Sequence, residues 1–463
     1  MTLQIEKAIV LGAGMAGLLC AESLAEAGLE VILVERDALP EKPEARAGVP
    51  QGRFVHQLLA GGLRILGTMF PGLEAELLAA GGVSIDWHRD VAWLSAAGWM
   101  PQASEHHSLS NISCTREVLE HVVRAKVSAH PRIRILQETE VASLRMEGRR
   151  ISGVDVRRVG KRSTTGLDAD LVVDASGRES KAPVWLEALG IPRAEETVVD
   201  ASLGYASHIV PAAPERLSGA HALILHPTPP TNTRSGTIFA IEGGRWIITL
   251  TGVGGDYPPI DREGFLAFAR SLRDPRLHDA IADRIPGPAR GYRNTANRLR
   301  RFDGLSDWPD GLLVVGDALC AFNPVYGQGM SVAAMTAKML GETLRANHGQ
   351  LECPAVQRAV VALNRIPWQM STSVDRSYPT TVVSGPEYGD PSSSPRDAIA
   401  AAVRDPDAYH RFLKVMHLVG DDDLQKKPSS TSSSLSNSPS SPNSSHASMG
   451  SVSSRSEAAT VDR

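Results

Sequence analysis

The sequence of 463 residues contains few cysteines, and they are scattered. Its four cysteines are Cys20, Cys114, Cys320 and Cys353, and no two of them have the close spacing of a metal site or a disulfide framework. We therefore expect free thiols and no metal site. This use of cysteine suits the reducing cytoplasm, which is the location that we expect.

The charge and the hydropathy of the chain exclude two kinds of partner. Lysine and arginine number 48 against 52 aspartates and glutamates, and the net charge of −4 offers no basic field for a nucleic acid. Residues 1–8 lead directly into an apolar run of strand length, so we expect no secretory signal there. No apolar run reaches the ~20 residues that a membrane-spanning helix needs, so we expect no integral membrane segment.

What the sequence does contain is a glycine-rich turn near its start. The apolar run Lys7–Leu11 predicts a strand, and Gly-Ala-Gly-Met-Ala-Gly follows at residues 12–17. A helical pattern and a second strand, Glu30–Val34, come next, and Glu35 ends that strand. This order of strand, glycine turn, helix, strand and acid is typical of a dinucleotide site.

Each part of the turn has a physical reason in such a site. Gly12 permits the tight turn, Gly14 lets the backbone approach a pyrophosphate, and Gly17 lets the helix pack closely on the strand. The pyrophosphate would lie at the helix N-terminus, where unpaired N–H groups favour an anion. Glu35 would accept hydrogen bonds from the adenosine ribose and repel a 2′-phosphate. The turn therefore favours NAD or FAD over NADP.

A second glycine-rich segment, at residues 311–330, favours FAD. Gly311–Val315 predicts a buried strand, and Gly316 and Asp317 follow at its C-terminal end. Ligands bind at that end of the strands in an open α/β sheet, so Asp317 can accept hydrogen bonds from ribityl hydroxyls.

The rest of this segment suits the ring of a flavin. Pro324 interrupts the chain, and Gly327 and Gly329 lead into a predicted helix, Met330–Leu344. The free N–H groups at the start of this helix would approach the pyrimidine end of an isoalloxazine ring. They would stabilise the negative charge that a reduced flavin carries there.

The two segments together resemble the flavoprotein monooxygenases of the para-hydroxybenzoate hydroxylase fold, over roughly residues 5–420. The likeness rests on residues 12–17 with Glu35-Arg36, and on Gly316-Asp317-Ala318 followed by Asn-Pro-Val-Tyr-Gly-Gln-Gly-Met at 323–330. Residues 48–56, Gly-Val-Pro-Gln-Gly-Arg-Phe-Val-His, resemble the branch of squalene epoxidase and the bacterial polyether epoxidases. The resemblance implies an α/β fold with a Rossmann-like FAD-binding domain, an inserted β-sheet substrate domain and a helical C-terminal region.

The resemblance also assigns residues to the parts of FAD. It implies that Met15, Ala16, Glu35, Arg36 and Arg46 lie at the adenosine end, Arg116 near the flavin phosphates and Val141 at the adenine. Asp317 and Met330 match contacts to the ribityl chain and the flavin ring. The expected cofactor-binding residues are Gly12, Gly14, Met15, Ala16, Gly17, Glu35, Arg36, Arg46, Arg116, Val141, Gly316, Asp317, Pro324, Gly327, Gly329 and Met330. Arg116 also begins a predicted helix, Arg116–Ser128, and a guanidinium suits phosphate binding.

The length of the chain predicts more than one domain. We assign residues 1–82, 116–194 and 293–350 to the FAD-binding domain, 83–115 and 195–292 to the substrate domain, and 351–424 to the helical C-terminal region. Residues 425–463 are rich in serine and poor in large apolar side chains. Such a segment cannot bury enough surface to offset its ordering entropy, and we expect it to be disordered.

Residues 175–180 depart from the pattern of the aromatic hydroxylases in this superfamily. Those enzymes carry Ala-Asp-Gly-x-x-Ser, and here Ser176 stands in the place of the aspartate. The aspartate is tied to flavin and nicotinamide binding. The resemblance therefore leaves open whether NADPH or NADH reduces the flavin directly or through a separate reductase.

Three functions are compatible with the sequence. The first is an FAD-dependent monooxygenase that takes one oxygen atom from O2 through a flavin hydroperoxide and epoxidises a small apolar polyketide or terpenoid of secondary metabolism. The second is an FAD-dependent aromatic hydroxylase, against which Ser176 argues. The third is a non-oxidative flavoprotein cyclase or isomerase. Because the flavin carries the chemistry, no catalytic base is required. Arg53 and His56 would share one face if residues 52–60 formed a helix, and we expect both to border the pocket.

Overall fold

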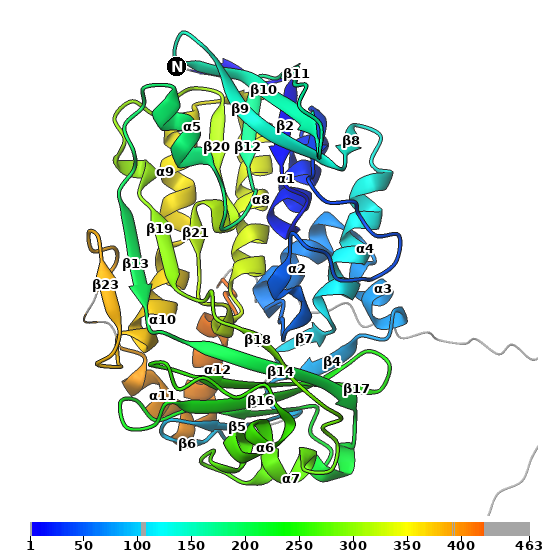
Figure 1. Ribbon diagram of the computed structural model, residues 1–463, viewed down its shortest axis with the longest axis vertical. Helices are drawn as coiled ribbons and strands as arrows, with labels where there is room; N and C mark the ends of the chain where they lie inside the picture. Colours follow the sequence, from blue (N-terminus) through cyan, green and yellow to red (C-terminus); the bar gives the residue numbers. More distant parts are fainter. Residues whose placement is uncertain (1, 103–107, 391, 393, 421–463) are drawn as a thin grey trace, which may run out of the picture. The chain divides into compact units, whose positions relative to one another are not determined.

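The computed structural model describes residues 2–102, 108–390, 392 and 394–420 (Figure 1). The serine-rich segment 425–463 lies outside the described residues. The described chain combines helices with two large sheets, one parallel and one mostly antiparallel. The α/β class expected from the sequence is confirmed.

A five-stranded parallel sheet, in the order β20-β12-β2-β3-β8, forms one half of the fold. Its strands are β2 (Lys7–Leu11), β3 (Glu30–Val34), β8 (Ile133–Leu136), β12 (Leu171–Asp174) and β20 (Leu312–Val314). The register sets Leu11 beside Val34 and beside Asp174, and Asp174 beside Val314. The carboxyl ends of four strands therefore meet at one edge. The predicted strands at 7–11 and 30–34 are confirmed, because continuous apolar runs suit strands covered on both faces.

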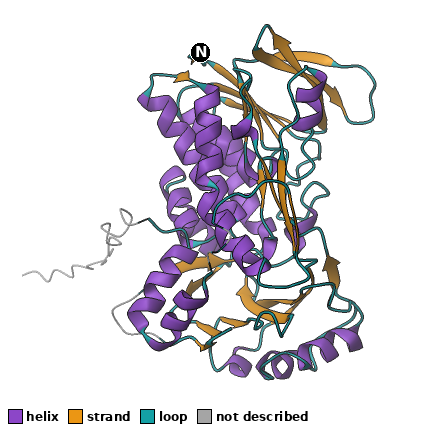
Figure 2. Cartoon of the chain, turned by 90° about the vertical axis from the view of Figure 1, so that its left-hand side faces the viewer, coloured by secondary structure: helices purple, strands orange, loops and turns teal. Residues whose placement is uncertain are grey.

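Helices and a small sheet flank these strands, as Figures 1 and 2 show. Helix α1 (Met15–Glu26) packs on β2 and β3 and against α4 (Arg116–Ala129) and α8 (Gly329–Ala346). A three-stranded antiparallel sheet of β9 (Thr139–Glu147), β10 (Arg150–Arg158) and β11 (Thr165–Asp168) packs on β12 and β3. The predicted helices at 116–128 and 330–344 are confirmed as α4 and α8.

A seven-stranded sheet, in the order β18-β14-β17-β16-β15-β5-β6, forms the other half. Its strands are β5 (Val91–Ser95), β6 (Gly98–Trp99), β14 (Gly204–Pro211), β15 (Ala222–Leu225), β16 (Arg234–Ile241), β17 (Arg245–Gly252) and β18 (Arg290–Tyr292). Trp246 and Ile248 of β17 pack with α6 (Arg262–Arg270) and α7 (Arg276–Ile281), whereas Ile247 packs with α12 (Pro406–Met416). The sheet is thus apolar on both faces.

Shorter elements join the two halves. The strands are β1 (Leu3–Gln4), β4 (Val83–Asp86), β7 (Ser110–Ser113), β13 (Glu196–Asp200), β19 (Asn297–Arg300), β21 (Cys320–Ala321), β22 (Gln350–Leu351) and β23 (Val382–Ser384). The helices are α2 (Ala60–Met69), α3 (Leu73–Ala79), α5 (Ala182–Ala188), α9 (Cys353–Leu363), α10 (Arg365–Asp375) and α11 (Arg396–Arg404). Among them, α10 bears directly on the second glycine segment.

A buried carboxylate at the end of α10 holds the turn before α8. Asp375, which is 1% exposed, accepts hydrogen bonds from Asn297 Nδ2 at 2.6 Å, Asn323 Nδ2 at 3.1 Å and the Tyr326 hydroxyl at 2.7 Å. Burial raises the pKa of the Asp375 carboxyl to about 6, although these donors favour its charged form. The carboxylate therefore ties the turn at residues 323–326 to β19 and α10.

Close backbone approach explains why the two glycine segments need glycine. A Cβ on Gly17 would lie 1.7 Å from the Gly12 carbonyl oxygen. Gly12 has φ +92° and turns against Ala175 at the end of β12, where a Cβ would lie 2.8 Å from the Ala175 carbonyl oxygen. A Cβ on Gly316 would lie 2.8 Å from the Cβ of Ala16. The two segments, far apart in the sequence, are thus in contact.

Gly17→Ala is expected to destabilise the fold. The added Cβ overlaps backbone that cannot move without displacing the turn, and overpacking of this kind costs roughly 3 kcal/mol of unfolding free energy. The thermal unfolding temperature of the cofactor-free protein measures the effect. Gly14→Ala is the matched control, because a Cβ on Gly14 meets no atom within 4 Å. Equal unfolding temperatures for the two variants would contradict this account.

Asp375→Asn is expected to remove a pH dependence of stability. The carboxyl has a pKa of about 6 in the folded chain against an ordinary value of 3.8, so the folded state binds the proton more tightly. Stability therefore falls as pH rises from about 4 to about 6, by roughly 3 kcal/mol. Thermal unfolding of both proteins across this range gives the difference between them. If that difference does not change with pH, Asp375 does not titrate as described.

Candidate cofactor and substrate site

A cavity of about 480 Å³ lies where the strands of the parallel sheet end. Its walls come from the turns that follow β2, β3, β12 and β20, from the first turns of α4 and α8, and from residues 46–51 and 55–57. Tyr292, at the end of β18, adds a wall from the seven-stranded sheet. The cavity therefore borders both halves of the fold.

Nearly all the expected cofactor-binding residues line this cavity. They are Gly12, Gly14, Met15, Ala16, Glu35, Arg36, Arg46, Arg116, Val141, Gly316, Asp317, Pro324, Gly327, Gly329 and Met330. Gly17 does not line it, because this residue faces the backbone of Gly12. Its part is to let α1 approach the turn.

Two charged side chains from outside the first glycine turn, those of Glu35 and Arg46, bond to its backbone. Glu35 accepts the Ala13 N–H at 2.7 Å and the Asp37 N–H at 2.8 Å. The Arg46 guanidinium donates to the Ala13 carbonyl at 2.8 Å and lies 3.2 Å from Glu35 Oε2. Helix α1 begins after Gly14 with no side-chain cap, so the N–H groups of its first turn keep their capacity for an anion.

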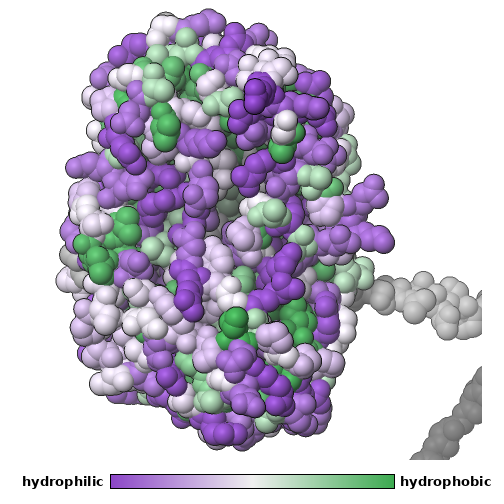
Figure 3. Space-filling model, viewed as in Figure 1, coloured by the Kyte–Doolittle hydropathy of each residue, from purple (hydrophilic) through white to green (hydrophobic). Residues whose placement is uncertain are grey.

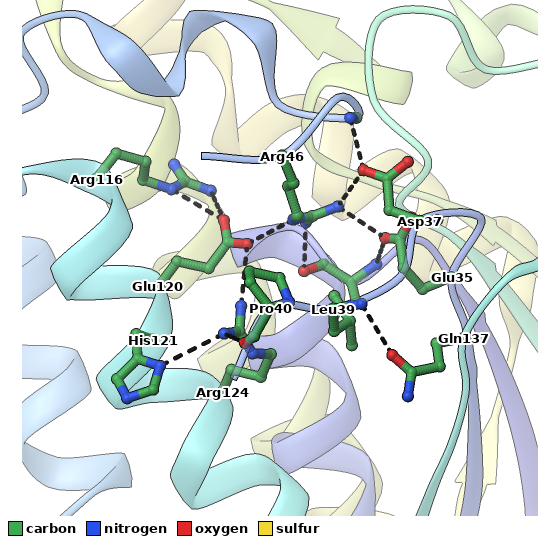
Figure 4. Close-up of polar contacts among 12 residues, drawn as sticks. Glu35, Asp37, Leu39, Pro40, Arg46, Arg116, Glu120, His121, Arg124 and Gln137 are labelled. Atoms are coloured by element: carbon green, nitrogen blue, oxygen red, sulfur yellow. Dashed lines mark hydrogen bonds and ion pairs between the residues drawn. The ribbon is translucent and has the colours of Figure 1, made fainter. Parts of the chain in front are cut away.

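A chain of buried charges connects this turn to α4 (Figure 4). Glu120 accepts from Arg46 Nε at 2.8 Å and from Arg116 Nη2 at 3.0 Å, and it lies 3.8 Å from Arg124. Burial would raise the pKa of Glu120, but Arg116 and Arg46 outweigh it and lower that pKa. Burial would likewise lower the pKa of Arg46, and Glu120 and Glu35 raise it instead. Glu120 and Arg46 therefore stay charged near neutral pH.

The second glycine segment also lines the cavity. Asp317 follows Gly316, and burial raises the pKa of its carboxyl, while Arg178 and Arg116 oppose the rise. Gly327 has φ +67°, and α8 begins at Gly329 with no side-chain cap. A Cβ on Gly329 would come within 3.8 Å of Asp317 Oδ1. The carboxylate and the free helix N-terminus are therefore neighbours.

Residues 52–60 do not form a helix, so Arg53 and His56 do not share a helical face, and the expectation that Arg53 borders the pocket is wrong. Pro50–Arg53 forms one short 3₁₀ turn, Phe54 has extended backbone, and α2 begins only at Ala60. The Phe54 ring packs edge-on against Tyr205 with centroids 4.9 Å apart, and this contact holds the chain extended. Arg53 is consequently exposed and does not line the cavity, whereas His56 does.

Several residues at the cavity were not identified from the sequence. The pairing of Glu120 with Arg116 could have been predicted, because the two residues are four positions apart on one helix and such pairs interact. The hydrogen bonds of Asp375 could not have been predicted from a local pattern, because its partners are distant in the sequence. Arg178 lines the cavity and donates to the carbonyls of Ala296 at 2.8 Å and Phe322 at 2.6 Å. Tyr292 and Phe322 complete this wall.

Ser176 bends back towards the strand that precedes it. Its backbone N–H donates to Asp174 Oδ1 at 2.9 Å, and its hydroxyl donates to the same oxygen. The Ser180 hydroxyl donates to Asp174 Oδ2. Asp174, fully buried at the end of β12, thus fixes the 175–180 turn beside the cavity.

One group within the described residues has the spacing of metal ligands. Glu22, Glu26 and His130 offer atoms within 4.8 Å of one another. His130 Nδ1 accepts the Arg132 N–H at 3.2 Å, so a neutral ring carries its proton on Nε2, which faces Glu26 at 3.3 Å. His130 is therefore already paired with Arg132 and Glu26.

No helix in the described ranges joins sufficient length to sufficient apolar character for crossing a bilayer. On the face drawn in Figure 3, hydrophilic residues are spread throughout and hydrophobic ones form small groups.

The chain is similar in sequence to three curated proteins. Protein Rv3254 of Mycobacterium tuberculosis is 31% identical over 439 residues, which cover 92% of this chain and 91% of that protein. The kynurenine 3-monooxygenase of Salinispora tropica is 28% identical over 361 residues, or 74% of this chain and 73% of that enzyme. The kynurenine 3-monooxygenase of Salinispora arenicola has the same identity over 360 residues.

Solved structures share the fold at low sequence identity. The flavin-dependent brominase Bmp2 matches with a TM-score of 0.63 and 16% identity, over 89% of this chain and 92% of that one. PqsL of Pseudomonas aeruginosa, described as a probable FAD-dependent monooxygenase, matches with a TM-score of 0.59 and 18% identity, over 81% and 96%. None of these names is that of an epoxidase.

The family comparison agrees with the geometry of the cavity. The model of the family described as the FAD binding domain matches residues 6–349, which contain both glycine segments. With its Rossmann-like sheet, its second sheet over the cavity and its C-terminal helices, the chain belongs to this family, that of the FAD-dependent flavin monooxygenases of the para-hydroxybenzoate hydroxylase fold.

Proposed function

We propose that the protein is a monooxygenase that holds FAD in the cavity and inserts one oxygen atom from O2 into an aromatic ring. One observation carries the proposal: the two glycine segments, about three hundred residues apart in the sequence, line the same cavity. A ligand that needs a phosphate site at one end and a ring site at the other suits this arrangement.

The adenosine and phosphate end of FAD fits the walls near α1. Gly14 has open space in front of its Cα, and the first turn of α1 has N–H groups free for a pyrophosphate. Arg46 and Arg116 supply positive charge beside it, each held by Glu120. Glu35, Arg36 and Val141 would then contact the ribose and the adenine.

The ribityl and ring end fits the walls near α8. Asp317 would accept hydrogen bonds from ribityl hydroxyls. Pro324, Gly327, Gly329 and Met330 would border the ring, with the N-terminus of α8 at its pyrimidine end. Bound FAD supplies the redox chemistry that activates O2. The chain's own residues bind and orient the reactants, exclude water and stabilise negative charge at that helix N-terminus.

An aromatic substrate is favoured by the relatives and by the cavity wall. Two relatives are named kynurenine 3-monooxygenases, and kynurenine carries an aromatic ring. In this chain Tyr292 and Phe322 border the cavity and offer aromatic contacts. Ser176, which counts against an aromatic hydroxylase, does so through the way in which the flavin is reduced. Reduction by NADPH or NADH, directly or through a separate reductase, is therefore part of the proposal.

Epoxidation of an alkene is the second candidate. Residues 48–56 resemble the polyether epoxidases, and residues 48–51, 55 and 56 of this stretch line the cavity, so the likeness falls largely on the candidate site. The two reactions need the same cofactor and the same exclusion of water. They differ in the substrate bond that receives the oxygen atom.

Asp317→Ala is expected to weaken FAD binding by about ten- to a hundred-fold, the effect of losing a charged acceptor. Asp317→Asn is the matched control, because it keeps one acceptor oxygen and is expected to bind FAD more tightly than the alanine variant. Titration of the cofactor-free proteins with FAD, followed by flavin fluorescence, gives the dissociation constants. If the alanine variant binds FAD as tightly as the wild type, Asp317 does not contact the cofactor.

The reaction itself is tested with the FAD-loaded protein. We expect O2 uptake that depends on NADPH, NADH or an added flavin reductase, and on an aromatic substrate such as kynurenine or 1-naphthol. Isotope-labelled O2 and mass spectrometry would then detect one labelled oxygen atom in the product, and NMR would locate it on the ring. Oxygen delivered only to an alkene, with squalene as the probe, would favour the second candidate. A protein that binds no FAD would contradict both candidate functions.

A further inference from the structure

Arg178, in the turn after β12, differs from the other basic residues that line the cavity. Those residues are Arg36, Arg46, Arg116 and Lys181. Arg46 and Arg116 each donate to the buried carboxylate of Glu120. Arg36 and Lys181 are exposed, so water screens their charge. Arg178 is only partly exposed, and it forms no ion pair with a carboxylate in the part of the chain that the structure describes. Its charge therefore has no direct partner.

Backbone carbonyls hold the Arg178 guanidinium in place. Nη1 donates to the Ala296 carbonyl at 2.8 Å, and Nη2 donates to the Phe322 carbonyl at 2.6 Å. Arg298 donates in turn to the carbonyl of Arg178 itself. The next residue in the chain, Glu179, is an exposed acid whose charge water screens. Because the carbonyl groups are neutral, they fix the position of the guanidinium and leave its charge uncompensated.

The charge of Arg178 acts at the end of the cavity where Asp317, Tyr292 and Phe322 lie. These three residues line the cavity together with Arg178. Burial raises the pKa of the Asp317 carboxyl, and Arg178 opposes this rise more strongly than Arg116 does. Burial also raises the pKa of Tyr292, and Arg178 is again the leading charge that opposes the rise. Under the proposed function, this end of the cavity receives the ribityl chain and the ring of FAD.

A flavin ring becomes negative when it is reduced. Near neutral pH, reduction adds two electrons and one proton to the ring, so the ring gains one negative charge. A fixed positive charge nearby stabilises the reduced form relative to the oxidised form, and a carboxylate such as that of Asp317 has the opposite effect. Arg178 offsets the charge of Asp317, so this end of the cavity can accommodate a negative ring.

We propose that Arg178 stabilises the negative charge of reduced FAD and thereby raises the reduction potential of the bound flavin. The inference rests on the proposed function, because it assumes FAD in this cavity. It assigns to a residue outside both glycine segments the control of how readily an electron donor reduces the flavin.

The reduction potential of the FAD-loaded protein tests this role directly. The flavin is reduced gradually without O2, in the presence of a reference dye of known potential, and the absorbance of both is recorded. We expect Arg178→Gln to shift the ratio of reduced to oxidised flavin about ten-fold towards the oxidised form. For a two-electron couple this shift lowers the potential by about 30 mV.

Sulfite gives a second readout that needs no reductant. Its sulfur adds to N5 of the oxidised flavin and supplies the electron pair of the new bond, so the ring takes up negative charge as it does on reduction. Loss of flavin absorbance gives the dissociation constant of sulfite. We expect this constant to be about ten-fold higher in Arg178→Gln than in the wild type.

Two further variants separate charge from structure. Arg178→Lys keeps the charge and loses the two-pronged geometry, so it should retain most of the wild-type potential. Lys181→Gln is the matched control, because it removes one positive charge from an exposed position three residues along the chain. It should leave the potential and the sulfite constant unchanged. FAD content and unfolding temperature establish that each variant is folded and loaded.

Three results would overturn the inference. The first is an unchanged potential in Arg178→Gln. The second is an equal fall in Arg178→Lys or in Lys181→Gln, because the effect would then not belong to the charge of Arg178. The third is failure of Arg178→Gln to fold or to hold FAD, which would make Arg178 a structural residue. In all three the wild type still binds FAD, so the proposed function stands. A wild-type protein that binds no FAD would instead defeat the proposed function.

Discussion

The parallel pairing of β2 with β12 and of β12 with β20 is the constraint on which the site depends. It brings the ends of three strands, and the turns after them, to one edge of a single sheet. Glycine at positions 12, 17 and 316 then allows backbone contacts that a Cβ would prevent. Any change that separated these strands would separate the two ends of the candidate FAD site.

Charge compensation decides how the phosphate end can be built. Arg46, Arg116 and Arg124 are largely buried, and burial of an unpaired guanidinium would be costly. Glu120 lies between the three guanidinium groups, and its negative charge offsets the cost of burying them. Its hydrogen bonds also fix the orientation of Arg46 and Arg116. A bound pyrophosphate would find its positive partners already oriented, so little ordering would be needed on binding.

The two halves of the fold divide the tasks of an oxygenase between them. The parallel sheet and its helices supply the groups that suit the cofactor, and the seven-stranded sheet reaches the same cavity through Tyr292. Residues 54–57 connect them, because Phe54 packs on the second sheet while Gln57 lies against the turn before α8.

The sequence by itself determined three strands of the parallel sheet (β2, β3 and β20), the glycine turns, the starts of α4 and α8, and fifteen cofactor-binding candidates that line the cavity. These features depend on local patterns: apolar runs, glycine spacing and an acid at a set distance. The tertiary structure alone decided that residues 54–59 form no helix, that Arg53 is exposed, and that Asp375 holds the turn at 323–326. Those outcomes depend on contacts with Tyr205, Asn297 and Asn323, which no local pattern encodes, because packing between distant segments outweighs the weak conformational preference of a short stretch of chain.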